Sequence, residues 1–153
     1  MNNYLSQVQI ASQVAIISVL GLIPKIDLPF LPGVPITAQT LGVMLAGTLL
    51  SIKNSLLSVI IFLTLVLIGA PLLSGGRGGI SVFFAPSSGY LLGWIVGTVV
   101  VSLSYKILKK NFETHTAAFI ACFLGGILVI HLFGVAGLTL ITDLSVTQAS
   151  FLS

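Results

Sequence analysis

Charged side chains are scarce in this sequence, and acidic ones are the scarcest. Three of the 153 residues are Asp or Glu and six are Lys or Arg, so that 6% of the chain is charged and 56% is hydrophobic. A soluble globular domain carries roughly 25% charged residues, and the mean hydropathy of +1.18 lies far from that class. The composition therefore predicts an integral membrane protein. No basic stripe is interleaved with aromatic residues, so the net charge of +3 indicates cytoplasmic loops rather than nucleic-acid binding.

Cysteine and the common catalytic motifs are nearly absent as well. Cys122 is the single cysteine, so an internal disulfide is excluded. It lies in an apolar run, which favours the role of a small buried hydrophobic residue. The chain contains no G-x-x-x-x-G-K-[ST], H-E-x-x-H or G-x-S-x-G pattern. We expect His131 to be a packed, hydrogen-bonded side chain, because His115 is too distant in sequence to share a metal with it. An enzyme, a metal site and a cofactor are thus not expected.

Long apolar runs dominate what is present. A helix needs about 20 residues to cross the hydrocarbon core, and prolines or polar breaks separate five such candidates. The expected spans are about 4–23, 36–52, 55–70, 84–108 and 116–138. They predict an all-α, polytopic transmembrane bundle that forms one membrane domain over residues 1–153. Its connecting loops 24–35, with four prolines, and 71–83, rich in glycine, lie at the same end.

The distribution of basic residues predicts the orientation. Four of them fall on one side of the expected bundle: Lys53, Lys106, Lys109 and Lys110. The other side holds Lys25 and Arg77. The positive-inside tendency then predicts a cytoplasmic N-terminus in the cell membrane and places loops 24–35 and 71–83 outside.

The first span carries small residues at a spacing of four, Ala11 and Ala15, together with the amides of Gln9 and Gln13. Small residues at this spacing let helix backbones approach closely in lipid, and amides facing lipid are costly. Two interpretations stay open for the alanines, which are packing within the chain and binding of a partner helix.

The stretch "SGGRGG", residues 74–79, holds the only arginine of the chain. Four glycines, Gly75, Gly76, Gly78 and Gly79, permit positive φ angles and suit a flexible lid over a ligand. Arg77 is a natural partner for a carboxylate. The alternative is an arginine that reaches lipid headgroups from a solvated loop.

Polar and aromatic residues flank this loop on both sides. "PITAQTLG", residues 35–42, brings Thr37, Gln39 and Thr40 to the outer end of the second span, and "ISVFFAPSSGYLLGW", residues 80–94, brings Phe83, Ser87, Tyr90 and Trp94 to the start of the fourth. An apolar pocket with a few directed polar groups is the usual form of a small-molecule site. We expect Thr37, Gln39 and Tyr90 as polar lining, Phe83 and Trp94 as apolar walls, and the glycines as lid.

At these residues the sequence resembles the BioY family, the biotin-specific S components of energy-coupling-factor (ECF) vitamin transporters. The family patterns are P-[IV]-T-x-Q-T-x-G, matched by residues 35–42; G-G-x-G-G, matched by 75–79; and [GA]-P-[ST]-x-G-Y-L-x-G-[FW], matched by 85–94. The resemblance covers residues 24–94. It implies high-affinity capture of biotin beneath the outer loops and no ATP site. It also implies partnership with a transmembrane coupling subunit and two ATPases, with Ala11 and Ala15 packing on the coupling subunit.

One departure from the family pattern bears on function. The family has six helices, and the sixth carries L-P-G-D-x-x-K, whose Asp and Lys help to hold the ligand. This sequence ends at Ser153 without that motif, and the surroundings of Asp143 do not match it. We expect the sixth helix to be missing through truncation, to be supplied by another chain, or to be lost with impaired binding. The alternatives to biotin capture are capture of another vitamin and a truncated, non-transporting membrane scaffold.

Overall fold

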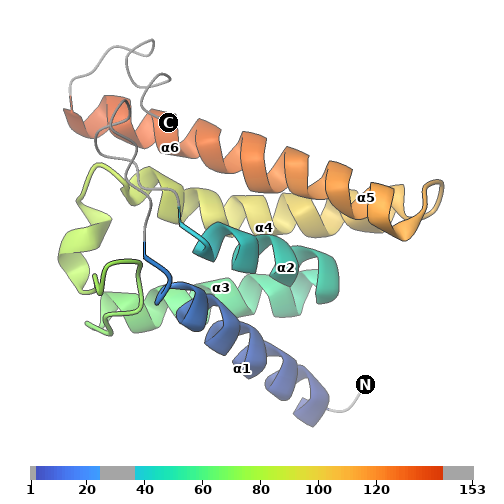
Figure 1. The fold of residues 1–153 in the computed structure, drawn as a ribbon, viewed down its shortest axis with the longest axis horizontal. Coiled ribbons are helices and arrows are strands. Elements are labelled where there is room, and N and C mark those ends of the chain that lie inside the picture. Colours follow the sequence, from blue (N-terminus) through green and yellow to red (C-terminus); the bar gives the residue numbers. More distant parts are fainter. Residues whose placement is uncertain (1–2, 25–36, 143–153) are drawn as a thin grey trace.

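The structure, a computed structural model, describes residues 3–24 and 37–142, with side chains to residue 140, and every regular element in this part of the chain is a helix. The elements are α1 (Asn3–Leu20), α2 (Gln39–Leu49), α3 (Ile52–Leu67), the 3₁₀ turn η1 (Ile80–Phe83), α4 (Ser88–Leu108), α5 (Thr114–Ala121), the π-helix η2 (Cys122–Val129) and α6 (Ile130–Thr142). The last three follow one another without a break and form one rod, called here the α5–η2–α6 rod (Figure 1). The predicted all-α class is confirmed.

Local sequence explains where the helices begin and end. The Ser51 hydroxyl accepts a hydrogen bond from the Asn54 backbone N–H at 3.3 Å and caps α3. The expected helix 55–70 therefore runs from 52 to 67, and Gly69, with a φ of +108°, turns the chain away. α4 begins at residue 88 instead of 84, because turns around Pro86 precede it. The predicted helices 4–23, 36–52 and 116–138 correspond to α1, α2 and the rod, whereas loop 24–35 lies outside the described residues except for its first.

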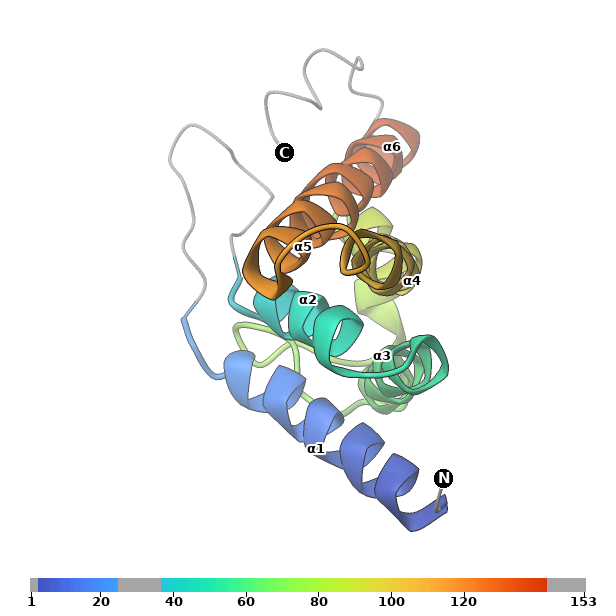
Figure 2. The ribbon, with the colours of Figure 1, turned by 90° about the vertical axis from the view of Figure 1, so that its right-hand side faces the viewer.

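α4 is the helix around which the others are arranged. It packs against α2, α3 and all three parts of the α5–η2–α6 rod, while α1 lies on α2 and α3, away from the rod (Figure 2). Three glycines at a spacing of four, Gly89, Gly93 and Gly97, form the face of α4 that meets the rod. A Cβ at Gly97 would lie 2.7 Å from the Gly125 carbonyl oxygen. The two backbones are thus in contact, as in other membrane helix pairs joined by small residues.

Side-chain amides join α1 to the two helices on which it lies, α2 and α3. Gln13 of α1 donates to the Gly42 carbonyl of α2 at 2.8 Å, and Asn54 of α3 donates to the Gln9 side-chain oxygen at 3.1 Å. The side-chain amides of Gln9 and Gln13 are therefore hydrogen-bonded within the protein, which offsets their cost in an apolar helix. They orient α1 so that Ala11 and Ala15 lie on its exposed side.

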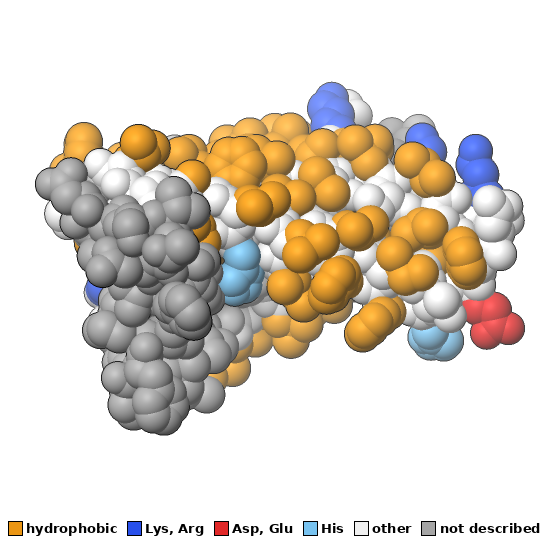
Figure 3. All heavy atoms as spheres, turned by 90° about the horizontal axis from the view of Figure 1, so that it is seen from above, with side chains coloured by type: hydrophobic (Ala, Val, Ile, Leu, Met, Phe, Trp, Pro, Cys, Tyr) orange, Lys and Arg blue, Asp and Glu red, His pale blue; other side chains and the backbone are white. Residues whose placement is uncertain are grey.

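The outer surface has the polarity expected for a bilayer. Large apolar side chains are exposed along the length of the bundle, and most charged side chains of the described residues lie toward one end (Figure 3). Among the described residues, Ser88–Leu108 and Thr114–Leu140 are long and apolar enough to cross a membrane, and α2 and α3 are shorter apolar helices.

Candidate functional site

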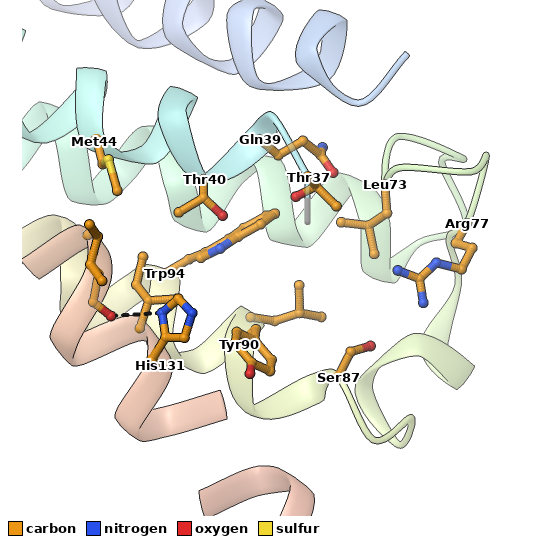
Figure 4. Close-up of a pocket in the computed structure, with 14 residues that line it drawn as sticks. Thr37, Gln39, Thr40, Met44, Leu73, Arg77, Ser87, Tyr90, Trp94 and His131 are labelled. Atoms are coloured by element: carbon orange, nitrogen blue, oxygen red, sulfur yellow. Dashed lines mark hydrogen bonds between the residues drawn. The ribbon is translucent and has the colours of Figure 1, made fainter. Parts of the chain in front are cut away.

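A cavity of about 210 Å³ lies at the end of the bundle where α2 and α4 begin. Four segments that are distant in sequence build its wall: the start of α2, the loop after α3, the first half of α4, and the η2–α6 part of the rod (Figure 4). The lining residues are Thr37, Gln39, Thr40, Met44, Leu73, Arg77, Ser87, Tyr90, Leu91, Trp94, Gly126, Ile127, Ile130 and His131. They combine an apolar and aromatic surface with a few polar groups, and include no carboxylate.

Gln39 is almost completely buried and joins three segments beside the cavity. Its side-chain nitrogen donates to the carbonyls of Ile17, at 3.3 Å, and Leu72, at 2.9 Å. Its side-chain oxygen accepts from the Ser74 backbone N–H at 3.0 Å. The amide therefore satisfies backbone groups of α1 and of the loop after α3, and positions that loop beside the cavity.

The glycine-rich stretch forms a tight hairpin. Leu73 and Arg77 exchange backbone hydrogen bonds of 3.0 and 3.2 Å, and the chain turns between them at Gly75 and Gly76, whose φ angles are +81° and +68°. Glycine is required at these positions because other residues are strained at such angles. The predicted motion of this segment as a lid stays a prediction.

Arg77 is anchored with its charged group on the cavity side of the hairpin (Figure 4). Its Nε donates to the Ser74 carbonyl at 3.3 Å, and the side chain is half-buried. In the described part of the chain, the one acidic residue is Glu113, at the opposite end of α4, and no ion pair with Arg77 is formed. The terminal guanidinium nitrogens therefore offer to the cavity a positive charge that no described residue neutralises.

α4 presents its first two turns to the cavity. Ser87, Tyr90, Leu91 and Trp94 follow a spacing that places them on one helical face. The Trp94 ring is held by Phe62 of α3, with ring centroids 6.1 Å apart. This face supplies a rigid aromatic wall.

The opposite wall comes from the rod and was missed by sequence reasoning. Gly126 lies against the Met44 side chain, and the cavity is also lined by Ile127 of the π-helix and by the buried Ile130 at the start of α6. The Nδ1 atom of His131 lies 2.9 Å from the Ile127 carbonyl, which can only accept, so Nδ1 carries the proton. In the neutral ring Nε2 is then an acceptor, and Figure 4 shows it on the cavity side. His131 is hydrogen-bonded as expected, and it also lines the cavity.

The predicted site residues divide into two groups. Seven of them lie in the cavity wall: Thr37, Gln39, Thr40, Arg77, Ser87, Tyr90 and Trp94. Five do not line it: Gly75, Gly76, Gly78, Gly79 and Phe83. The glycines shape the backbone of the hairpin and its exit instead, and Phe83 packs against the hydrophobic core.

The bundle of apolar helices with a small cavity at one end defines the class: a polytopic membrane protein with a site of small-molecule size. Comparison with known proteins narrows this class. The model of the BioY family matches residues 2–153. A Rhizobium etli protein named "Biotin transporter BioY" is 45% identical over 139 residues, covering 88% of this chain and 74% of that protein. A Bacillus subtilis protein named "Probable biotin transporter BioY" is 42% identical over 153 residues, covering 100% of this chain and 81% of that protein.

A solved structure gives the same answer for the fold. The crystal structure of the S-component for biotin from an ECF-type ABC transporter superposes with a TM-score of 0.89 at 31% identity, covering 98% of this chain and 81% of that one. The chain belongs to the BioY family. The resemblance found in residues 24–94 is thereby confirmed and extends over nearly the whole chain.

Proposed function

We propose that this protein captures biotin as the S component of an ECF-type vitamin uptake transporter. The observation that carries the proposal is the cavity wall, in which the guanidinium of Arg77, without an ion-pair partner among the described residues, faces an apolar and aromatic surface. Biotin combines a carboxylate with a compact bicyclic ring, and the cavity has complementary groups for both. The relatives of this family that are named biotin transporters support the same ligand.

The proposed pose follows from the chemistry of the wall. The ligand carboxylate lies at Arg77, where a charge-assisted hydrogen bond contributes about 1.5–3 kcal/mol. The ring packs between Trp94 and Met44. Polar groups at its edge meet the hydroxyls of Thr37 and Thr40 and the Nε2 acceptor of His131.

The remaining wall residues have supporting roles in this proposal. Ser87 and Tyr90 line the side of α4, and Gln39 holds the hairpin in place. Gly75, Gly76, Gly78 and Gly79 act through the hairpin backbone as the lid, and Phe83 supports it from the core.

The proposed orientation places the cavity outside the cell and the N-terminus in the cytoplasm. The excess of lysine at the end remote from the hairpin supports this orientation. The whole of residues 1–153 then acts as one membrane domain, with α1, α2, α3, α4 and the α5–η2–α6 rod as its spans.

Energy for uptake comes, in this proposal, from partners. The protein has no catalytic residues of its own and works with a transmembrane coupling subunit and two ATPases. The exposed face of α1 around Ala11 and Ala15 is the proposed contact with the coupling subunit. The similarity to an S-component from an ECF-type ABC transporter supports this assembly.

Equilibrium binding of radiolabelled biotin to the purified protein in detergent tests the proposal. We expect saturable binding that unlabelled biotin competes and that thiamine and riboflavin do not. Competition by another vitamin in place of biotin would move the protein to a different substrate. Absence of saturable binding for all three vitamins would favour the non-transporting scaffold.

A further inference from the structure

A second cavity, of about 450 Å³, lies at the opposite end of the bundle from the first. It is called here the lysine groove. The turn from α2 to α3 forms one side, and the last turns of α4 with the chain that follows form the other. Lys106, Lys109 and Lys110 line it, together with Tyr105, Thr48 and Ser51. None of its lining residues is acidic.

The positive charge of the lysine groove is not neutralised within the described chain. No ion pair joins Lys106, Lys109 or Lys110 to a carboxylate in residues 3–24 and 37–140, and Glu113, on the turn that follows α4, is not part of the lining. Lys109 instead lies over the ring of Tyr105, with Nζ 5.4 Å from the ring centroid. Three lysine side chains therefore line an open volume, and none of them forms an ion pair within the described residues.

The interior of the groove offers hydrogen-bonding groups in fixed positions. Ser102 donates to the Gly47 carbonyl at 2.8 Å and lies 3.0 Å from the Ser55 hydroxyl, which fixes the floor. Ser51, which also lines the groove, accepts from the Asn54 N–H, so that its own hydroxyl proton remains to be donated. Leu50 and Ile52 add apolar surface beside these polar groups.

The position of the groove along α4 indicates the kind of ligand. α4 is one of the helices long and apolar enough to cross the bilayer, and its last turn carries Tyr105 and Lys106. Tyrosine and lysine at the end of such a helix lie at headgroup depth. A ligand that reaches the groove from the bilayer brings a phosphate to the lysines and apolar chains to the neighbouring surface.

We propose that the lysine groove binds the phosphate headgroup of an anionic phospholipid. The site is separate from the proposed vitamin cavity, and its test does not use vitamin binding. Basic pockets between membrane helices hold lipid phosphates by charge and hydrogen bonding together. A groove that only follows the general excess of lysine at this end would attract anionic lipid without retaining it.

The experiment compares lipid retention by the purified full chain with native mass spectrometry. Dioleoyl phosphatidylglycerol is the anionic probe and dioleoyl phosphatidylcholine is the zwitterionic control. We expect retention of phosphatidylglycerol to exceed that of phosphatidylcholine and to fall about fivefold in Lys106→Gln and in Lys109→Gln. Lys53→Gln, which removes the same charge at the same end from a residue outside the groove, should leave retention unchanged.

Thr48→Phe tests the shape of the groove independently of its positive charge. This change fills the groove with a ring while every lysine stays, and the Thr48 hydroxyl bonds only carbonyls of its own helix. Loss of phosphatidylglycerol retention in Thr48→Phe, with circular dichroism and size-exclusion profile unchanged, supports the site. Equal losses in Lys53→Gln and Lys106→Gln with full retention in Thr48→Phe would overturn it. A thermal midpoint raised by inorganic phosphate as much as by phosphatidylglycerol would overturn the lipid assignment in favour of a free anion.

Discussion

Arg77 is the residue on which the ligand proposal depends most directly, through its charged guanidinium. Arg77→Ala should weaken biotin binding by about 1–3 kcal/mol, or roughly 5- to 150-fold in Kd, because the ligand carboxylate loses a charge-assisted hydrogen bond. Isothermal titration calorimetry measures the effect. Lys53→Ala, which removes one positive charge at the far end of the bundle, is the control and should leave Kd unchanged. Equal Kd values for Arg77→Ala and the unsubstituted protein would mean that the arginine contacts lipid or water instead.

Gln39 should matter for stability as well as for the site. Gln39→Leu keeps the approximate volume but leaves the carbonyl of Leu72 and the N–H of Ser74 without their partner, while the Ile17 carbonyl keeps the bond from the Gly21 N–H. We expect a loss of about 1–3 kcal/mol and a fall of several degrees in Tm, measured by differential scanning fluorimetry in detergent. Thr40→Val, at the next position of the same cavity wall, should preserve Tm. A Gln39→Leu protein as stable as Thr40→Val would show that the loop is held by other contacts.

Sequence patterns predicted the polar residues of the hairpin side of the cavity better than those of the rod. Thr37 and Trp94 belong to short motifs whose residue types already indicate a ligand pocket. His131 is an isolated histidine in an apolar helix, and such a residue is usually packed and hydrogen-bonded. Its access to the cavity depends on how the rod packs against α2, which no local pattern encodes.

At the scale of the elements, the glycine face of α4 sets the distance between α4 and the rod. Replacing glycine by alanine at two positions, Gly97 and Gly126, tests this close contact. Gly97→Ala places a Cβ against the Gly125 carbonyl, which is backbone and cannot rotate away, so α4 and the rod must separate. Gly126→Ala places the same methyl group against Cε, Cγ and Sδ of Met44, an unbranched side chain that can move aside by rotation about its bonds. We expect Gly97→Ala to lower Tm by several degrees and Gly126→Ala to leave it nearly unchanged. The reverse order would contradict the close contact of α4 with the rod.

Helix existence was predictable from hydropathy, but helix boundaries and the π-helix were not. Five apolar runs yield five long or short helical segments in the described chain, because a helix pairs the backbone polar groups of an apolar segment within the segment itself. Ser51 and Gly69 decide the ends of α3 through a single cap and a single positive φ. The π-helix at Cys122–Val129 adds residues per turn without changing composition, so a search for helical periodicity passes over it.

At the scale of the whole molecule, the separation of the lysine end from the hairpin end predicts the orientation in the membrane. Ser81→Cys lies on the hairpin side and Asn111→Cys on the turn after α4, and both positions are exposed. With Cys122 replaced by alanine, a membrane-impermeant maleimide should label Ser81→Cys in intact cells and Asn111→Cys only after permeabilisation. Labelling of Asn111→Cys in intact cells would invert the orientation.

The exposed face of α1 is the last surface of the molecule with a proposed partner. Ala11 and Ala15 lie on the side of α1 that packs on neither α2 nor α3, because Gln13 and Ile17 turn toward the bundle. Ala11→Trp should leave biotin binding intact but lower biotin uptake in cells by about tenfold or more, since an indole blocks close approach of the coupling helix. Ala136→Trp places the same ring at an exposed alanine of α6 and should not affect uptake. Loss of binding together with uptake in Ala11→Trp would indicate misfolding, and unchanged uptake would remove α1 as the contact with the coupling subunit.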